Sequence, residues 1–497
     1  MKKMNLLAMS LISAAALSFS SCSSNDDFAG GGTQSQADGV YMTLKISGAT
    51  SHGTRTGVTA NKTTTENGIE VESTITQGML YIYDGNTCVF RKVITADMFK
   101  TPPTQATAGE TKPIKVAVTG AIKTNTPYHV YFLANNTSVT DPIAATSIFT
   151  STTGGADFAT NNNFVMFNQN DGTKNAAHST VTFTDDAKSE ATPAAATEIK
   201  LDRVVARIDN PSFDETVTTV TPAENTTTSI NVADVVAGIS YEGFAVSNLN
   251  NNSYVMQNWD EKFNTLSVKW GEPKYYLPKS AYGTLYKAEG DLNFSSKEKP
   301  VSWKYAFENT TTKEDEATAV YFKVKVGLTE TAMNTSDFRD GTFYRYDGRL
   351  YTSIQAIYND AATGAISNPF TETDEILPAA VVAKITGTDG KLTTDEDVLA
   401  KFREDYKIEV YRQGTMYYRW AISDNAYKPF VASETTHTYS VLRNSIYRLK
   451  VTKVSEIGKD VPNGPEPDDP IKNPNFYMNV TVSINPWVLN AQPIELK

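Results

Sequence analysis

Hydrophobic and polar residues alternate in two segments at opposite ends of the chain. Residues 39–48 read G-V-Y-M-T-L-K-I-S-G and residues 477–484 read Y-M-N-V-T-V-S-I. Every second residue is apolar, which is the period of a half-buried β-strand. The apolar positions are Val40, Met42, Leu44 and Ile46 in the first segment and Met478, Val480, Val482 and Ile484 in the second. The shared pattern would let the two strands occupy one groove in turn, although most terminal strands of this kind complete their own sheet.

The pattern between these segments predicts many short strands and few helices. Residues 79–93 form a predicted hairpin, because Asp84-Gly85 supplies a turn in which glycine accepts a positive φ. Two helices are expected, one capped by Thr394 and one through residues 353–360. Further strands are expected at residues 114–118, 128–133, 180–184, 198–208, 238–247, 318–326, 416–422 and 446–454, and residues 343–351 contain another predicted Asp-Gly hairpin. This balance predicts an all-β protein with few short helices.

The length and charge of the chain limit its organisation and its partners. A chain of 497 residues exceeds one ordinary core, so at least two domains are expected. The threonine-rich segment 216–229 is the preferred boundary, because it has no core-forming periodicity. The net charge of −11 argues against nucleic acid and anionic membrane surfaces as partners, since both need clustered lysine and arginine.

The N-terminus has the pattern of an export signal. Lys2 and Lys3 precede an apolar stretch at residues 6–17, and F-S-S-C ends at Cys22. This resembles a bacterial lipoprotein signal, in which the cysteine is lipidated, for example with palmitate, and becomes the first residue. Plain secretion with cleavage near Ser21 is the alternative. If Cys22 is lipidated, only Cys88 remains, so no disulfide can form within the chain.

One arginine follows the first predicted strand in a run of small residues. Residues 47–58 read S-G-A-T-S-H-G-T-R-T-G-V, with Arg55 as the only basic side chain between Lys45 and Lys62. An extended and accessible segment of this kind suits an Arg-specific protease that cuts between Arg55 and Thr56. The alternative is an ordinary solvated loop arginine.

The segment before the terminal strand is rich in proline. Residues 461–470, V-P-N-G-P-E-P-D-D-P, contain four prolines, which fix φ and remove backbone donors. This segment therefore predicts a stiff, extended spacer in front of the terminal strand.

The sequence shows no enzyme motif and no metal-binding motif. It lacks a nucleophile elbow, a phosphate-binding loop and the zinc motif H-E-x-x-H. A paired-carboxylate glycosidase site stays open, since such pairs meet only in the fold. The four histidines are scattered at His52, His129, His178 and His437. We therefore expect no catalytic residues, no metal and no cofactor.

Several segments together resemble the fimbrillins of Bacteroidetes, in particular the shaft subunits of Mfa-type fimbriae. They are the signal with Cys22, the first strand followed by T-R-T-G, L-D-R-V-V-A-R-I at residues 201–208, Y-S-V-L-R-N-S-I-Y-R-L at residues 439–449 and V-T-V-S-I-N-P-W ending at Trp487. The resemblance implies two tandem transthyretin-like β-sandwich domains. The expected divisions are a signal at 1–21, a leader with the first strand at 22–55, an N-terminal domain at 56–215, and a C-terminal domain at 216–497 with a donor strand at about 471–497.

The resemblance also implies a route of assembly. A lipidated precursor reaches the outer membrane, an Arg-specific protease cuts Arg55–Thr56, and the first strand leaves an unpaired edge and an apolar trough. Residues 476–488 of the next subunit, including Trp487, then fill that trough. The implied partners are identical subunits, accessory tip and anchor subunits, and the protease, with the membrane reached only through the precursor's lipid.

Two other functions remain open at this point. A tip or anchor adhesin of the same fold differs in whether it is cleaved or can donate a strand. A surface glycan-binding lipoprotein is also compatible, since 25 tyrosines and 5 tryptophans offer rings for sugar stacking. Strand packing is the ordinary explanation of those aromatic residues.

Overall fold

The structure is a computed structural model of the whole chain. It describes residues 39–48, 66–67, 69–99, 114–120, 122–144, 146–169, 179–213, 232–257, 292–295, 301–311, 313–370, 377–422, 439–454, 456–462 and 478–488. In this part of the chain, strands predominate and helices are few and short, so the all-β prediction is confirmed. None of the described helices is long and apolar enough to cross a membrane.

The N-terminal region is built on one eight-stranded sheet. Its strands are β1 (Gly39–Gly48), β3 (Gly78–Asp84), β4 (Thr87–Ile94), β5 (Ile114–Thr119), β6 (Pro127–Ala134), β10 (Met166–Asn168), β11 (Ser179–Thr182) and β12 (Ala194–Arg203). The main order is β4-β3-β6-β10-β12-β1-β5, and β11 pairs with β6. The predicted hairpin is β3–β4, with Gly85 at φ 57° in its turn. One core cluster covers this sheet and also includes Val255, Phe307 and Ile446 from later in the chain.

Residues 198–208 differ from the single predicted strand. They form β12 and then β13 (Ala206–Asp209), which lie in two different sheets. Buried Val204 and Val205 connect them. Because these valines continue the apolar run, the sequence pattern does not reveal the point at which the chain passes from one sheet to the next.

The C-terminal region contains two larger sheets around a second core. One contains β2 (Glu66–Asn67), β13, β14 (Ser212–Phe213), β17 (Trp303–Ala306), β25 (Ser445–Val454) and β26 (Met478–Val488). The other contains β15 (Val236–Ser247), β19 (Ala319–Leu328) and β23 (Thr415–Ala421). The residues of their shared core come from the part of the chain between Ala206 and Ile457. The predicted boundary at residues 215 and 216 lies outside the described residues and stays a prediction.

Three further pairs of short strands lie outside these sheets. They are β7 (Ile148–Thr150) with β16 (Asn252–Tyr254), β8 (Ala159–Thr160) with β9 (Asn163–Phe164), and β18 (Asn309–Thr311) with β24 (Tyr439–Val441). The β7–β16 pair connects a segment of the first region with a segment of the second. Short helices are α1 (Ala96–Phe99), α2 (Val232–Val235) and α3 (Glu330–Thr335).

A helical lobe with its own core lies at one end of the molecule. It consists of β20 (Phe343–Tyr346), β21 (Arg349–Tyr351), β22 (Glu409–Tyr411), α4 (Ile354–Ala362), α5 (Pro378–Lys384) and α6 (Glu396–Tyr406). The helix α4 matches the prediction and is capped by Ser353. The predicted cap Thr394 is wrong, because the Asp395 side chain accepts the amides of Asp397 and Val398. A carboxylate at that position also suits the helix dipole.

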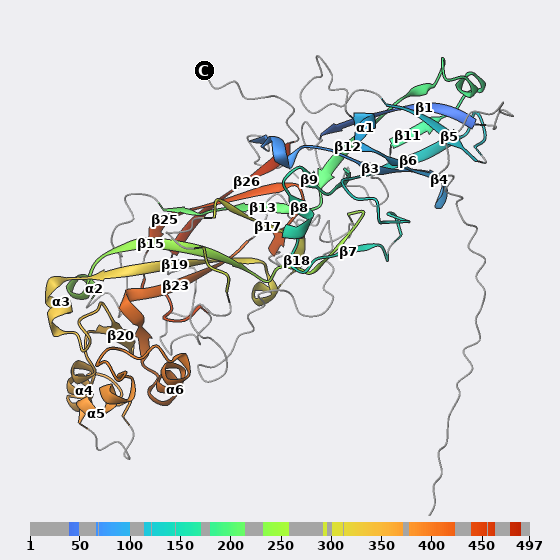
Figure 1. The fold of residues 1–497 in the computed structure, drawn as a ribbon. Helices are drawn as coiled ribbons and strands as arrows, with labels where there is room; N and C mark the ends of the chain where they lie inside the picture. Colours follow the sequence, from blue (N-terminus) through green and yellow to red (C-terminus); the bar gives the residue numbers. More distant parts are fainter. Residues whose placement is uncertain are drawn as a thin grey trace, which may run out of the picture.

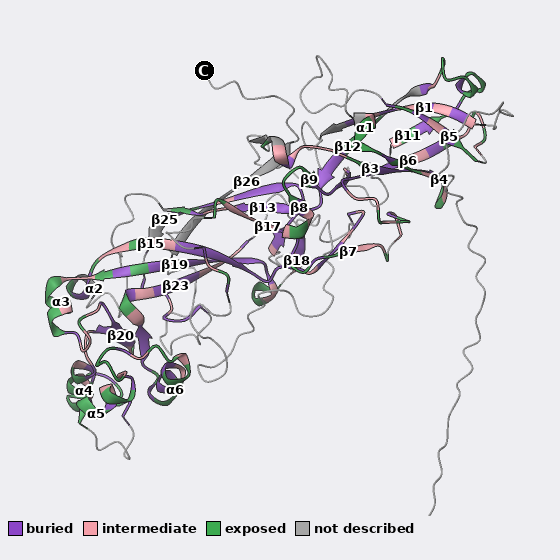
Figure 2. Cartoon of the chain, viewed as in Figure 1, coloured by how far each residue is buried: buried purple, intermediate pink, exposed green. Residues whose placement is uncertain are grey.

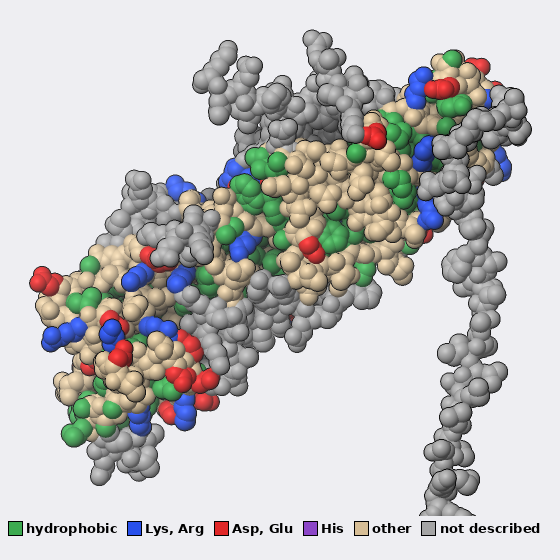
Figure 3. Space-filling view, viewed as in Figure 1, with side chains coloured by type: hydrophobic (Ala, Val, Ile, Leu, Met, Phe, Trp, Pro, Cys, Tyr) green, Lys and Arg blue, Asp and Glu red, His purple; other side chains and the backbone are tan. Residues whose placement is uncertain are grey.

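The molecule is elongated, with the sheet that contains β1 at one end and the helical lobe at the other (Figure 1). The strands between these ends are largely buried, whereas the outer faces of the lobe helices are exposed (Figure 2). On the face drawn in Figure 3, charged side chains gather at the helical end and few lie in the middle.

Candidate functional site

The first strand lies inside the N-terminal sheet. On one side β1 pairs antiparallel with β5, from Gly39 opposite Thr119 to Leu44 opposite Ile114. On its other side it pairs parallel with β12, up to Gly48 opposite Leu201. The apolar side chains predicted to face a core are all buried, with exposed fractions of 5% for Val40 and 0% for Met42, Leu44 and Ile46. Apolar and polar residues therefore alternate in this strand because only one of its faces is fully buried.

This position corrects the expectation of a single unpaired edge. The strand β5 has no strand partner other than β1 in the described part of the chain. Removal of β1 would therefore separate β5 from β12 and expose two rows of backbone groups that face one another. Such a slot offers hydrogen bonds to an incoming strand on both sides, whereas an edge offers them on one side.

Two of the predicted modification sites lie outside the described residues. These are the lipidation site Cys22 and the cleavage site Arg55–Thr56. The described chain stops at residue 48, at the end of β1, and resumes at residue 66, at the start of β2. Arg55 therefore belongs to the segment that connects the buried first strand to the rest of the protein.

The terminal strand β26 pairs with the chain's own second sheet. Its backbone runs antiparallel to β25, from Met478 opposite Val454 to Pro486 opposite Ser445. On its other side its described partner is β2, which contributes only Glu66 and Asn67. The five predicted donor positions, of which Trp487 lies opposite Glu66, are part of this strand. In this structure the terminal strand therefore completes the chain's own sheet.

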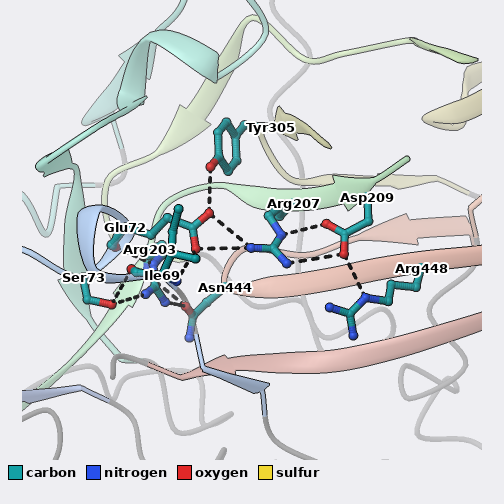
Figure 4. A network of polar contacts seen from close by, with 9 residues as sticks. All are labelled: Ile69, Glu72, Ser73, Arg203, Arg207, Asp209, Tyr305, Asn444 and Arg448. Carbon is teal, nitrogen blue, oxygen red and sulfur yellow. Dashed lines mark hydrogen bonds and ion pairs between the residues drawn. The ribbon is translucent and has the colours of Figure 1, made fainter. Parts of the chain in front are cut away.

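A buried polar network lies between the two regions (Figure 4). We call it the junction network; its members are Ile69, Glu72, Ser73, Arg203, Arg207, Asp209, Tyr305, Asn444 and Arg448. Glu72 has an exposed fraction of 0% and accepts from Arg207 Nη1 at 3.2 Å and from the Tyr305 hydroxyl at 2.8 Å. Arg207 also donates to Asp209. The chain just after β2 is thereby attached to β13 and β17 of the second sheet.

The same network attaches β12 to the residues that precede β25. Arg203 donates from Nε to the Glu72 carbonyl at 2.9 Å and from Nη1 to Asn444 Oδ1 at 3.2 Å. Asn444 in turn donates to Asp202 Oδ1. Thus β12, which borders the slot of β1, and β25, which pairs with the terminal strand, are connected through three buried side chains.

The charges of the network compensate one another in a buried environment. Burial opposes the charge of Arg207, but Asp209 and Glu72 outweigh it and raise the pKa of this guanidinium. For Arg203, burial lowers the pKa, and the carboxylates of Glu72 and Asp202 oppose that shift. Such groups are costly to leave unpaired, so Glu72 of the N-terminal region and Arg207 of the second sheet depend on each other.

A second buried ion pair uses the neighbouring residue of the same motif. Arg443 donates from Nε to Glu308 Oε2 at 2.8 Å and from Nη1 to the Val255 carbonyl at 3.0 Å. The V-L-R-N motif therefore gives two adjacent side chains that connect different parts of the molecule. In the sequence this motif indicates only a family resemblance. The buried partners of Arg443 and Asn444 are distant in the chain and cannot be inferred from the motif.

Comparison with known proteins supports the resemblance seen in the sequence. Residues 409–493 match the family model described as "Major fimbrial subunit protein type IV, Fimbrillin, C-terminal". The matched segment includes β25 and β26, and it confirms the resemblance to the fimbrillin superfamily. That family model describes the C-terminal part of a major fimbrial subunit protein. No match is found among curated proteins.

Three solved structures are similar to most of the chain at low identity. One is a fimbrilin (fimA) from Porphyromonas gingivalis W83, with 16% identity, 91% of this chain and 99% of that chain covered, and a TM-score of 0.42. Another is a putative cell adhesion protein from Parabacteroides distasonis ATCC 8503, with 13% identity, 90% and 97% coverage, and a TM-score of 0.41. The third is the tip fimbrial protein Mfa3 from Porphyromonas gingivalis with C-terminal truncation, with 12% identity, 90% and 100% coverage, and a TM-score of 0.32.

Proposed function

We propose that this chain is the precursor of a shaft subunit of a cell-surface fimbria. Lipidation at Cys22 delivers the precursor to the outer membrane, and an Arg-specific protease then cuts Arg55–Thr56. The first strand leaves the N-terminal sheet, and residues 478–488 of the next subunit take its place. Tip and anchor subunits of similar fold complete the fimbria, which supports adhesion.

The observation that carries this proposal is the position of β1. The strand is buried between β5 and β12, and it is joined to the rest of the chain through the segment that contains Arg55. One cut in that segment makes a central strand of the sheet a separate peptide. Exchange of this peptide for another strand then requires no further break in the chain.

The energetics favour refilling the slot over leaving it empty. An apolar side chain contributes roughly 1.5–3 kcal/mol on burial, so four alternating apolar side chains give an upper bound of roughly 6–12 kcal/mol before ordering costs. Because each subunit both accepts and donates a strand, the contact is head-to-tail and does not close on itself. Repetition of that contact builds a filament.

The test is cleavage of the purified precursor with an Arg-specific protease. The new N-terminus is sequenced, and the product is run unheated on a denaturing gel. We expect a start at Thr56 and an SDS-resistant ladder, both lost in Arg55→Ala. The control Arg91→Ala changes an arginine within β4 and should leave cleavage at Arg55 unchanged. A chain that ends before residue 476 should be cut but should form no ladder.

A competing peptide makes the same test specific for the slot. An excess of a peptide with residues 38–48 should suppress the ladder, because it reoccupies the position of β1. The same peptide with Leu44→Asp should not, because a carboxylate would enter the buried face. Resistance of Arg55 to cleavage, or an identical ladder in Arg55→Ala, would contradict the proposal.

The pairing of β26 with β25 favours one second candidate. A subunit that keeps its terminal strand in its own sheet accepts a strand but donates none, as expected of a tip or terminal subunit. In that case cleavage would give a start at Thr56 and no ladder, while a peptide with residues 478–488 would still bind the cleaved chain.

A further inference from the structure

The chain segment between β25 and the proline-containing spacer is fixed by many contacts. We call residues 456–460 the root segment, because the terminal strand follows it in the chain. The Tyr418 hydroxyl donates to the Glu456 carbonyl at 2.7 Å, and the Tyr411 hydroxyl donates to the Gly458 carbonyl at 2.7 Å. Tyr417 and Lys459 exchange two backbone hydrogen bonds, of 2.8 and 2.9 Å. Both β22 and β23 therefore secure the root segment.

The helical lobe adds two buried arginines to these contacts. Arg403 of α6 forms an ion pair with Asp460, and their exposed fractions are 2% and 4%. Asp460 Oδ2 also accepts the Val410 amide at 2.8 Å. Arg345 of β20 donates to the Ile457 carbonyl at 3.1 Å and pairs with Glu409. The lobe thus supplies charge-assisted contacts that the terminal strand does not take part in.

Close backbone packing also fixes the middle of the root segment. A Cβ atom at Gly458 would lie 2.5 Å from the Tyr417 carbonyl oxygen, so a side chain does not fit there without a backbone shift. The Gly458 amide points to the Met416 sulfur at 3.4 Å. This packing is against β23, in the sheet that does not contain β26.

These contacts give the C-terminal end of the chain two parts with different restraints. The root segment is attached to β20, β22, β23 and α6, whereas β26 is attached to β25 and β2. We infer that the helical lobe is the fixed attachment point of the donated strand: β26 leaves β25 during exchange, while residues 456–460 stay bound to Arg403, Arg345 and β23. This inference rests on the proposed function and assigns a role to the lobe within it.

The physical reason is the difference between the two kinds of attachment. A strand ladder opens one residue pair at a time, and a neighbour's slot can replace its hydrogen bonds. A buried ion pair has no such replacement, because separation leaves two charges without partners in a dry environment. When the terminal strand detaches, the chain therefore stays bound from Asp460 toward its N-terminus. A pulling force on the filament is then transmitted to the rest of the subunit through the Arg403–Asp460 pair.

The test compares amide hydrogen exchange in the full-length precursor and in the filament of the cleaved chain. The Lys459 amide, which donates to Tyr417, should exchange at rates that agree within about threefold in the two states. The exchange rates of the β25 amides that face β26 should differ by more between the two states, because these amides lose their partner strand and become exposed to solvent. Exchange of Lys459 as fast as those β25 amides in the filament would overturn the inference.

Two variants that each remove an ion pair of α6 isolate the role of the buried pair. Asp460→Asn removes the buried carboxylate charge, whereas Asp405→Asn removes the charge of the exposed Lys401–Asp405 pair on α6. We expect Lys459 exchange in the filament to rise about tenfold or more in Asp460→Asn. The Asp405→Asn filament should match the unchanged chain, and equal behaviour of the two variants would overturn the role of the ion pair.

A milder variant covers the case in which Asp460→Asn does not fold. Tyr418→Phe deletes only the hydroxyl that donates to Glu456. It should raise Lys459 exchange in the filament more than in the precursor, and an equal rise in both would overturn the inference. Absence of a ladder from the unchanged cleaved chain would instead contradict the proposed function, and the attachment role with it.

Discussion

The first and last strands of this chain share one sequence pattern but differ in how the fold holds them. The first strand β1 has extended partners on both sides, with six register pairs to β5 and six to β12. The last strand β26 has nine register pairs with β25 but only two with β2. One strand is therefore enclosed in its sheet, and the other is secured along one side.

This difference separates the two steps of the proposed strand exchange. An enclosed strand that is covalently joined to the subunit cannot leave without disrupting its sheet, so its departure depends on a cut in residues 49–65. A strand secured along one side can detach without a cut, provided that an equivalent ladder is available elsewhere. In the proposed function, the same alternating pattern serves a blocked acceptor in one place and a movable donor in the other.

The largest expected effect comes from the junction network, which connects the two regions. Glu72→Gln removes the carboxylate charge that faces Arg207, and breaking a buried ion pair costs about 3–5 kcal/mol. Denaturant unfolding of the precursor should show this loss of free energy. The control Asp185→Asn removes a surface pair with Lys188, whose side chains are 68% and 64% exposed, and should leave the denaturation midpoint unchanged. Equal behaviour of the two variants would contradict the structural role of Glu72.

A core truncation in β1 distinguishes the precursor from the assembled form. Leu44→Ala opens a cavity in the N-terminal core and should lower the precursor's unfolding free energy by about 2–5 kcal/mol. Because β1 is absent from the filament, the ladder formed after cleavage should resist SDS as well as the unchanged chain does. The control Lys45→Ala changes a half-buried position on the other face of the strand. A weaker ladder in Leu44→Ala would indicate that β1 remains in the filament.

Alkaline pH should weaken the sheet that encloses β1. Burial raises the pKa of Tyr131 in β6 to about 12, from an ordinary value of 10.0. The folded state therefore favours the neutral phenol, and its contribution is complete below pH 10 and lost as pH rises through 12. The slope is about 1.4 kcal/mol per pH unit for this one group. Tyr131→Phe should reduce the slope between pH 10 and 12, and an unchanged slope would contradict the assignment.

The smallest effect is expected at the weak side of the terminal strand. Replacement of Glu66–Asn67 by Gly-Pro removes the β2 pairing, and it should cost no more than about 1 kcal/mol because only two register pairs are lost. Laddering after cleavage should be as fast as in the unchanged chain, or faster. A severe loss of stability would show that β2 matters as much as β25 and would remove the contrast between the two strands.

The sequence predicts those parts of the fold that have a local cause. The strand β1 and the β3–β4 hairpin follow from alternation and from Asp84-Gly85, because each pattern is complete within a few residues. The sequence does not predict the passage from β12 to β13, because Val204 and Val205, which separate the two strands, continue the apolar run. The helix α5 was missed as well, because V-V-A-K and its neighbours show no clear helical period.

The junction network could not be predicted because its partners are distant in sequence. Glu72 and Arg207 are 135 positions apart, and Asp202 and Asn444 are 242 apart. In the sequence, charged and polar residues whose partners are so distant cannot be distinguished from surface residues. The candidate strands were therefore visible in the sequence, whereas the side chains that connect the two regions were not.

A cryo-electron microscopy structure of the filament formed by the cleaved chain tests the central claim most directly. The account predicts a strand between β5 and β12 whose side chains fit residues 478–488 of the neighbouring subunit. Density for residues 39–48 in that position, or direct pairing of β5 with β12, would contradict strand exchange through this slot.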